Sequence, residues 1–176
     1  MKFLRFLFFG LALLLLTACS SGEKEPLELK LELREHEVHS IEEVSGTVHL
    51  RNQSDLALLV HTRLFLLPLQ ASPYASEGLL LIYDSSGDRV IKQHLRIDYR
   101  YPSEETLHLL EPEKKITASF YLSSWFYPSE LRQGEKYTIA VIYQNDIDIT
   151  KTIGGVEVPS WVGSVRSNEE TFVLLP

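Results

Sequence analysis

Apolar and charged side chains alternate one by one over much of the chain after residue 26. The clearest run is residues 27–34, where four leucines alternate with Glu28, Lys30, Glu32 and Arg34. This period of two is typical of a half-buried β-strand. Similar alternation occurs at residues 44–51, 97–101, 116–122 and 137–143, and residues 79–83 and 171–175 are further predicted strands.

Two segments depart from this alternation. Residues 56–67 are apolar at both parities, which predicts a central strand that ends before Pro68. Residues 124–131 predict one helical turn. About seven to nine short strands with regular turn signals predict an all-β fold, an antiparallel sandwich.

The amino terminus has a different composition. Lys2 and Arg5 precede an apolar stretch from Phe6 to Leu16, interrupted only by Gly10. This stretch is too short to span a bilayer, which needs about 20 apolar residues. Basic residues, a short apolar stretch and small residues at its end predict a cleaved secretory signal helix.

The only cysteine follows this stretch directly. Leu16-Thr17-Ala18-Cys19 resembles the lipobox of bacterial lipoproteins. The resemblance implies cleavage between Ala18 and Cys19 and lipidation of Cys19, so the protein would contact the membrane through a lipid anchor. Ser20 is similar to the residue found after the cysteine of outer-membrane lipoproteins. The alternative is a lone cysteine in a retained anchor helix.

These features predict three parts: a signal peptide at residues 1–18, a lipidated tether at residues 19–27, and one domain at residues 28–176. The implied location is the cell envelope, and in a Gram-negative host the outer membrane, at its periplasmic face or its surface. The chain has 17 basic and 24 acidic residues, a net charge of −7. This acidity disfavours binding to nucleic acid or to anionic headgroups.

The segment before the late strand is a candidate tyrosine corner. Leu131-Arg132-Gln133-Gly134-Glu135-Lys136-Tyr137 introduces the run at 137–143. It resembles the tyrosine corner of immunoglobulin-like domains, where a hydroxyl bonds to backbone just upstream. Gly134 and Tyr137 are therefore structural candidates, and Tyr143 is expected to matter less. The alternative is an ordinary core tyrosine at a strand start.

Two further resemblances support an immunoglobulin-like sandwich. The order of three short motifs resembles that in bacterial immunoglobulin-like lipoproteins and inhibitor-type sandwiches. The motifs are Asn52-Gln53-Ser54-Asp55, Leu66-Leu67-Pro68 and the corner segment. The segment from Trp161 to Asn168 resembles the ending of exported bacterial immunoglobulin-like domains. We expect Trp161 to cover a sheet end beside Gly163, and Ser167-Asn168 to turn the chain into its last strand. An exposed Trp161 would instead be a candidate binding residue.

Candidate catalytic and metal-binding patterns are weak. The six histidines, at positions 36, 39, 49, 61, 94 and 108, show no H-E-x-x-H spacing, and one cysteine allows no C-x-x-C pair. His49 and His61 would meet only if their strands were neighbours in register. There is no P-loop and no G-x-S-x-G elbow. We therefore expect that the protein is not an enzyme and that it binds neither a cofactor nor a metal ion.

Aromatic loops indicate binding instead. Residues 67–74, 99–102 and 125–128 are unusually apolar or aromatic for loops. Tyr74 and Tyr101 are the candidate contacts, whereas Trp125 and Phe126 are expected to cap the sandwich. We predict a non-catalytic module that binds or scaffolds an envelope protein. The alternative is an inhibitor-like sandwich that presents residues 68–73 to a protease.

Replacing the sole thiol tests the predicted anchor. Cys19→Ser removes the sulfur that would carry the lipid, so labelling with an alkyne fatty acid should be lost and an unprocessed precursor should accumulate. Gel fluorescence after metabolic labelling measures this. Equal labelling of the variant and the parent would contradict the lipoprotein interpretation.

Overall fold

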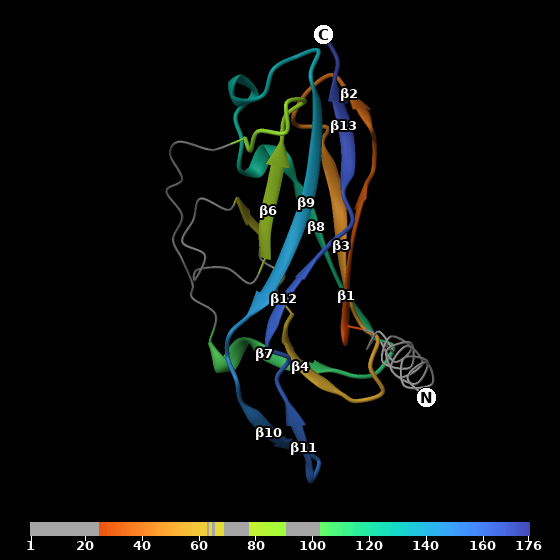
Figure 1. The fold of residues 1–176 in the computed structure, drawn as a ribbon, viewed down its shortest axis with the longest axis vertical. Helices are drawn as coiled ribbons and strands as arrows, with labels where there is room; N and C mark the ends of the chain where they lie inside the picture. Colours follow the sequence, from red (N-terminus) through yellow and green to blue (C-terminus); the bar gives the residue numbers. More distant parts are fainter. Residues whose placement is uncertain (1–24, 63, 65, 69–77, 91–102) are drawn as a thin grey trace, which may run out of the picture.

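A computed structural model describes residues 25–62, 64, 66–68, 78–90 and 103–176 of the chain (Figure 1). These residues form mainly antiparallel sheets joined by turns and three short 3-10 helices, so the predicted all-β class is confirmed. The proposed signal helix and the lipobox lie outside the described residues.

Most strands of the two main sheets fall close to the segments that the sequence predicts, and the predicted strand at residues 97–101 lies outside the described residues. In chain order they are β1 (Leu27–Leu33), β2 (Glu37–Val38), β3 (Ser45–Asn52), β4 (Leu58–His61), β5 (Leu66–Pro68), β6 (Gly78–Tyr83), β7 (Leu107–Leu110), β8 (Lys115–Tyr121), β9 (Lys136–Asn145), β10 (Thr150–Ile153), β11 (Val156–Pro159), β12 (Gly163–Arg166) and β13 (Glu170–Leu174). The 3-10 helices are η1 (Glu104–Thr106), η2 (Leu122–Ser124) and η3 (Pro128–Glu130).

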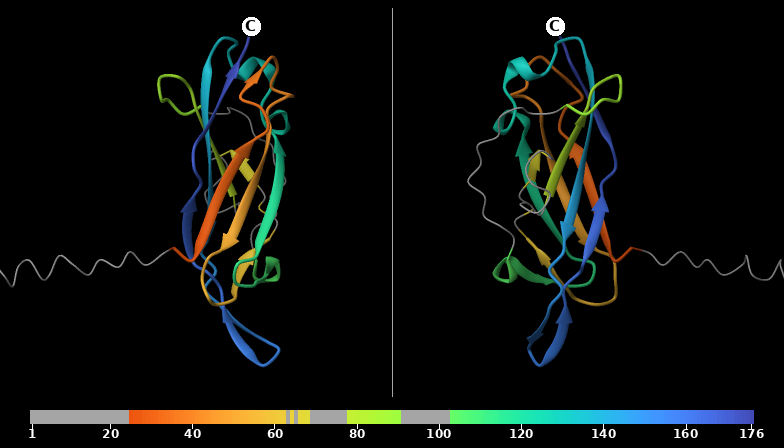
Figure 2. Two further views of the ribbon diagram at one scale, coloured as in Figure 1. Left: turned by 90° about the vertical axis from the view of Figure 1, so that its right-hand side faces the viewer. Right: turned by 60° about the vertical axis from the view of Figure 1, so that its left-hand side comes forward.

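Two main sheets face each other and form the sandwich (Figure 2). One is three-stranded with the order β1-β3-β8. The other is six-stranded with the order β2-β13-β9-β6-β5, and β12 also pairs with β9. These orders correspond to strands A-B-E and G-F-C of an immunoglobulin-like sandwich. The short pairs β4-β7 and β10-β11 extend one end of the molecule.

The core lies between the two main sheets and follows the alternation in the sequence. In β1 the odd-numbered leucines at 27, 29 and 31 are buried, and the charged residues between them are exposed. Opposite them, β9 buries Tyr137, Ile139, Val141 and Tyr143. Removing this apolar surface from water is the main driving force for closing the sandwich.

The prediction of one strand over residues 56–67 is wrong. β4 pairs with β7 in a separate sheet, whereas β5 runs parallel to β6 in the six-stranded sheet. Leu64, between them, has a φ of 42°, a left-handed conformation that interrupts an extended strand. β4 is apolar at both parities because Leu58 and Val60 face the main core, while Leu59 packs in a second cluster with Leu107 and Val158.

The entry into β9 has the geometry of a tyrosine corner. The Tyr137 hydroxyl accepts a hydrogen bond from the backbone N–H of Arg132 at 2.6 Å and lies 3.4 Å from the Arg132 carbonyl. Burial raises the pKa of this hydroxyl, although the Arg132 N–H opposes the rise. Gly134 turns the chain with a φ of 79°, and its N–H donates to the Leu174 carbonyl at 2.6 Å.

A second tyrosine hydroxyl works at the other end of β9. Tyr143 is fully buried, and its hydroxyl accepts the backbone N–H of His61 at 2.9 Å. His61 ends β4, so this bond ties the small β4-β7 sheet to the six-stranded sheet. Because both hydroxyls accept a backbone N–H, the structure leads us to expect a similar stability cost for loss of either hydroxyl, in place of the smaller cost expected at Tyr143 from the sequence.

A β-bulge connects β12 to β13. Arg166 faces Ile142 and Glu170 faces Ile139, so three residues, 167–169, lie opposite two on β9. The extra residue changes which positions face the core. The core-facing side chain on β12 is at an odd position, Val165, whereas those on β13 are at even positions, Phe172 and Leu174. At the bulge the Asn168 side chain accepts the Leu31 N–H at 2.9 Å and donates to the Leu31 carbonyl at 3.0 Å. Asn168 thus links the six-stranded sheet to β1.

Removing either hydroxyl should destabilise the sandwich. Tyr137→Phe and Tyr143→Phe each leave a backbone N–H in or near the core without its acceptor, so each should cost about 1–3 kcal/mol of unfolding free energy. Denaturant midpoints measure this. Tyr121→Phe is the matched control, because Tyr121 is half exposed, and it should change stability by less than about 0.5 kcal/mol. A neutral Tyr143→Phe would contradict the role assigned to its hydroxyl.

Candidate binding surface

Several residues predicted from the sequence lie outside the described residues. These are Ala18 and Cys19 at the proposed cleavage site, the candidate contacts Tyr74 and Tyr101, and positions 69–73 of the inhibitor-like loop. Their roles therefore remain predictions. The described residues place the other candidates.

Trp161 belongs to the core and is not a surface contact. Its side chain is only 8% exposed and stacks at a tilt against Tyr143, with ring centroids 5.6 Å apart. A Cβ on Gly163 would lie 3.1 Å from the indole, and Gly163 has a φ of 146°, so a side chain there would crowd the ring. The burial of Trp161 agrees with the structural role expected for this segment and does not agree with the alternative role as an exposed binding residue.

The histidines do not converge. His49 lies on the outer face of the three-stranded sheet and bonds to the Thr117 hydroxyl at 2.8 Å, whereas His61 is fully buried in β4, so the two do not meet. His36 donates to the Thr171 carbonyl at 2.7 Å at the opposite end of the sandwich. Among the described residues, no group of three or more His, Cys, Asp or Glu side chains is placed to hold a metal ion.

The outer face of the three-stranded sheet carries paired charges. Lys30 contacts Glu32 at 2.6 Å, and Arg51 pairs with Glu28 and Glu113. The hydrogen bond between Lys30 and Glu32 raises the pKa of the lysine and lowers the pKa of the glutamate. These side chains are about half exposed, so the pairs contribute little to stability. A self-paired polar face of this kind is well suited to contact with water.

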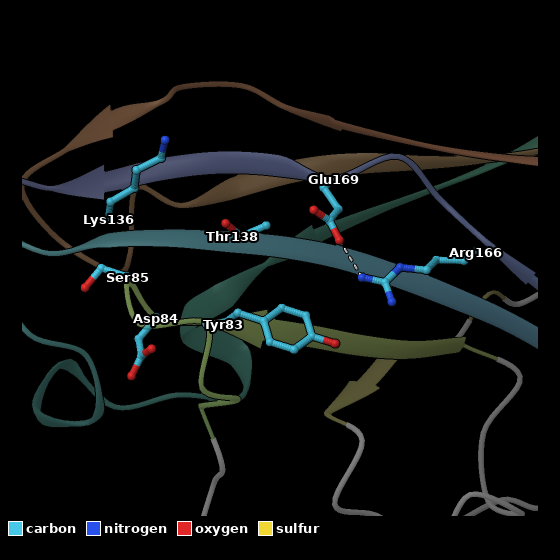
Figure 3. Close-up of a pocket in the computed structure, with 8 residues that line it drawn as sticks. Tyr83, Asp84, Ser85, Lys136, Thr138, Arg166 and Glu169 are labelled. Atoms are coloured by element: carbon cyan, nitrogen blue, oxygen red, sulfur yellow. Dashed lines mark hydrogen bonds and ion pairs between the residues drawn. The ribbon is translucent and has the colours of Figure 1, made fainter.

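The outer face of the six-stranded sheet has a shallow depression of about 410 Å³ (Figure 3). Its lining comes from the end of β6 and the following turn, from β9, and from the bulge: Tyr83, Asp84, Ser85, Gly87, Lys136, Thr138, Arg166 and Glu169. In Figure 3 the Tyr83 ring lies between the Arg166-Glu169 pair and the side chains of Asp84 and Ser85.

The depression offers fixed charges of both signs. Arg166 contacts Glu169 at 2.6 Å, and Ser85 donates to Glu135 at 2.6 Å. Asp84 accepts from the hydroxyl and N–H of Ser86, and the Ser86 hydroxyl bond lowers the pKa of the carboxyl. Lys136 adds a cation at the rim. Such a surface can hydrogen-bond and pair with the backbone and charged side chains of a peptide.

Exposed aromatic side chains lie at the end of the sandwich that carries the turn at residues 84–88, and Tyr121 belongs to β8 of the three-stranded sheet. We call this end, formed by residues 83–88 and 121–136, the corner end. Tyr127 is 68% exposed and Tyr121 is 49% exposed. Phe126 is buried, and Trp125 packs against Phe120 with centroids 6.3 Å apart, so these two residues cap the core. The loop at 125–128 thus provides both a cap and a tyrosine contact surface.

A buried polar network lies at the opposite end and was not identified from the sequence. His61 contacts the Thr106 hydroxyl at 2.7 Å and the Asn145 side-chain oxygen at 3.0 Å. Asn145 also donates to the Trp161 carbonyl at 2.6 Å and accepts the Ile147 N–H at 3.1 Å. Buried polar groups need such partners. Because each residue belongs to a different segment, no local sequence signal reveals the network.

No protein-family model matches the chain, and no curated protein matches its sequence. In the part of the chain that the structure describes, no helix has the length and apolar character needed to cross a membrane.

The buried network predicts a large effect for a single amide. Asn145→Ala removes the partner of the His61 ring, the Trp161 carbonyl and the Ile147 N–H, so we expect a loss of about 2–4 kcal/mol in unfolding free energy. Chemical denaturation measures it. Asp146→Ala, at the exposed neighbouring position, should change stability by less than about 0.5 kcal/mol. Equal effects at the two positions would contradict the network.

Proposed function

We propose that this protein is a non-catalytic, lipid-anchored lipoprotein of the bacterial cell envelope whose immunoglobulin-like domain binds or scaffolds another envelope protein. The lipobox-like segment ending at Cys19 supports the anchor. The exposed tyrosines of the corner end are the observation that carries the binding role, because tyrosine supplies contact area at low entropic cost.

The position of the corner end supports the same role. β1 begins at Leu27, the last residue of the proposed tether, at the end that carries β4-β7 and the β10-β11 hairpin (Figure 1). Residues 121–127 lie at the other end. A domain tethered through Cys19 would therefore present Tyr121 and Tyr127 away from its attachment point, where a protein of the envelope can reach them.

The depression on the six-stranded sheet adds polar contacts to this surface. It lies beside the turn at residues 84–88, which the Ser85-Glu135 hydrogen bond joins to the corner segment. A partner that covers the corner end could therefore also contact this turn, which lines the depression. Aromatic anchors surrounded by polar groups are the usual composition of a protein-protein interface.

Photo-crosslinking in cells tests the proposed interface. A benzophenone amino acid at position 127 of the full-length protein should give a specific crosslink to one envelope protein, identified by mass spectrometry. With that partner purified, Tyr127→Ala should weaken binding at least about tenfold, the effect expected of a tyrosine hot spot.

The matched control is position 30. Lys30 is exposed on the charged face of the three-stranded sheet, and the crosslinker there should not capture the same partner. Lys30→Ala should leave the affinity unchanged. Crosslinks of equal yield from both positions, or a partner whose affinity is unchanged by Tyr127→Ala, would contradict the proposed interface.

A further inference from the structure

The exposed apolar side chains differ between the two ends of the sandwich. Among the described residues, the large apolar side chains with substantial exposure are Leu56, Leu109, Tyr121, Tyr127, Ile153, Val156 and Val162. The two tyrosines lie at the corner end. The five aliphatic residues belong to the turn after β3, to β7, to the β10-β11 hairpin and to the turn before β12, which all lie at the end where β1 begins.

The β10-β11 hairpin is held firmly at its base. Val158 is buried against Leu59 and Leu107, and the Ser160 hydroxyl accepts the Ile149 N–H at 2.9 Å. The Lys151 ammonium donates to the Glu104 carbonyl at 2.7 Å. The hairpin therefore projects from the sandwich as a supported element (Figure 2).

The apolar face of the hairpin continues past this base to its tip. Ile153 pairs directly with Val156, and in strand periodicity both lie on the face that buries Val158. Beyond the base this face is uncovered, with Val156 64% and Ile153 38% exposed. Gly154 and Gly155, with φ values of 59° and 84°, form the tight turn between them.

The proposed tether brings this end close to a bilayer. This step rests on the proposed function, because it requires a lipid on Cys19. Eight residue steps separate Cys19 from Leu27, and a fully extended chain of that length spans at most about 29 Å. The four-residue strands of the hairpin extend about 13 Å. Tethering also keeps the apolar tip at a high effective concentration beside the membrane.

We infer that the tip of the β10-β11 hairpin, Ile153 to Val156, is a second membrane contact that inserts into the interface of a zwitterionic lipid leaflet. Aliphatic residues without an aromatic or arginine among them fit lipid better than a protein hot spot. The neighbouring exposed acids, Glu104, Glu105 and Glu157, disfavour anionic headgroups. Insertion would fix the orientation of the domain and direct the corner end away from the membrane.

Fluorescence quenching tests this contact in the full-length lipidated protein. Because a lipidated Cys19 has no free thiol, Val156→Cys introduces one unique labelling site. An environment-sensitive dye at position 156, with the protein in phosphatidylcholine and phosphatidylethanolamine vesicles, should be quenched by nitroxide lipids at least about threefold more than the same dye on Tyr127→Cys. Adding Ile153→Ser should remove most of the difference, whereas Thr152→Ser, at the adjacent exposed position, should not.

The outcomes separate this inference from the proposed function. Equal quenching at positions 156 and 127 in a protein that carries fatty acid on Cys19 overturns the hairpin contact and leaves the anchor intact. Absence of fatty acid on Cys19 overturns both. The quenching should persist when the salt concentration is raised about tenfold, because apolar burial is not screened. Quenching that requires anionic lipid would overturn the zwitterionic assignment.

Discussion

Two tyrosine hydroxyls on β9 hold together the parts of this protein that the strand pairing alone does not join. Tyr137 accepts the N–H of Arg132 at the crossover between the sheets, and Tyr143 accepts the N–H of His61 from the small β4-β7 sheet. Their rings fill the core, with Tyr137 stacked on Phe172 and Tyr143 against Trp161. Each tyrosine thus buries an apolar ring, and its hydroxyl accepts a hydrogen bond from one backbone N–H that would be costly to leave unpaired in a dry interior.

The two ends of the sandwich are suited to different surroundings. The corner end has exposed tyrosines and a polar turn that lines the depression, and the other end has aliphatic side chains around a projecting hairpin. This difference between the two ends is consistent with a domain that is tethered to a membrane at one end. In the function that we propose, the aliphatic end would lie at the membrane to which the lipid holds it, and the aromatic end would be presented to a protein partner.

The failures of sequence reasoning have a common physical cause. A segment that buries both of its faces is apolar at both parities, whether it forms one strand or two strands in different sheets. The pattern at residues 56–67 therefore does not distinguish these two arrangements. From the sequence alone, Trp161 could be an exposed hot spot or a core residue, because the ring that it packs against, Tyr143, lies on β9. In both cases the deciding contacts come from segments distant in the chain.

The sequence by itself determined the all-β class, most main-sheet strands and their inward faces, because alternation along a strand records which side meets the core. It also identified Tyr137, whose hydrogen-bond partner lies only five residues upstream. Only the tertiary structure decided the roles of Tyr143, Asn145 and Asn168. Their partners, His61, Trp161 and Leu31, are supplied by other segments of the chain, and no local pattern specifies which distant backbone groups a buried polar side chain will meet.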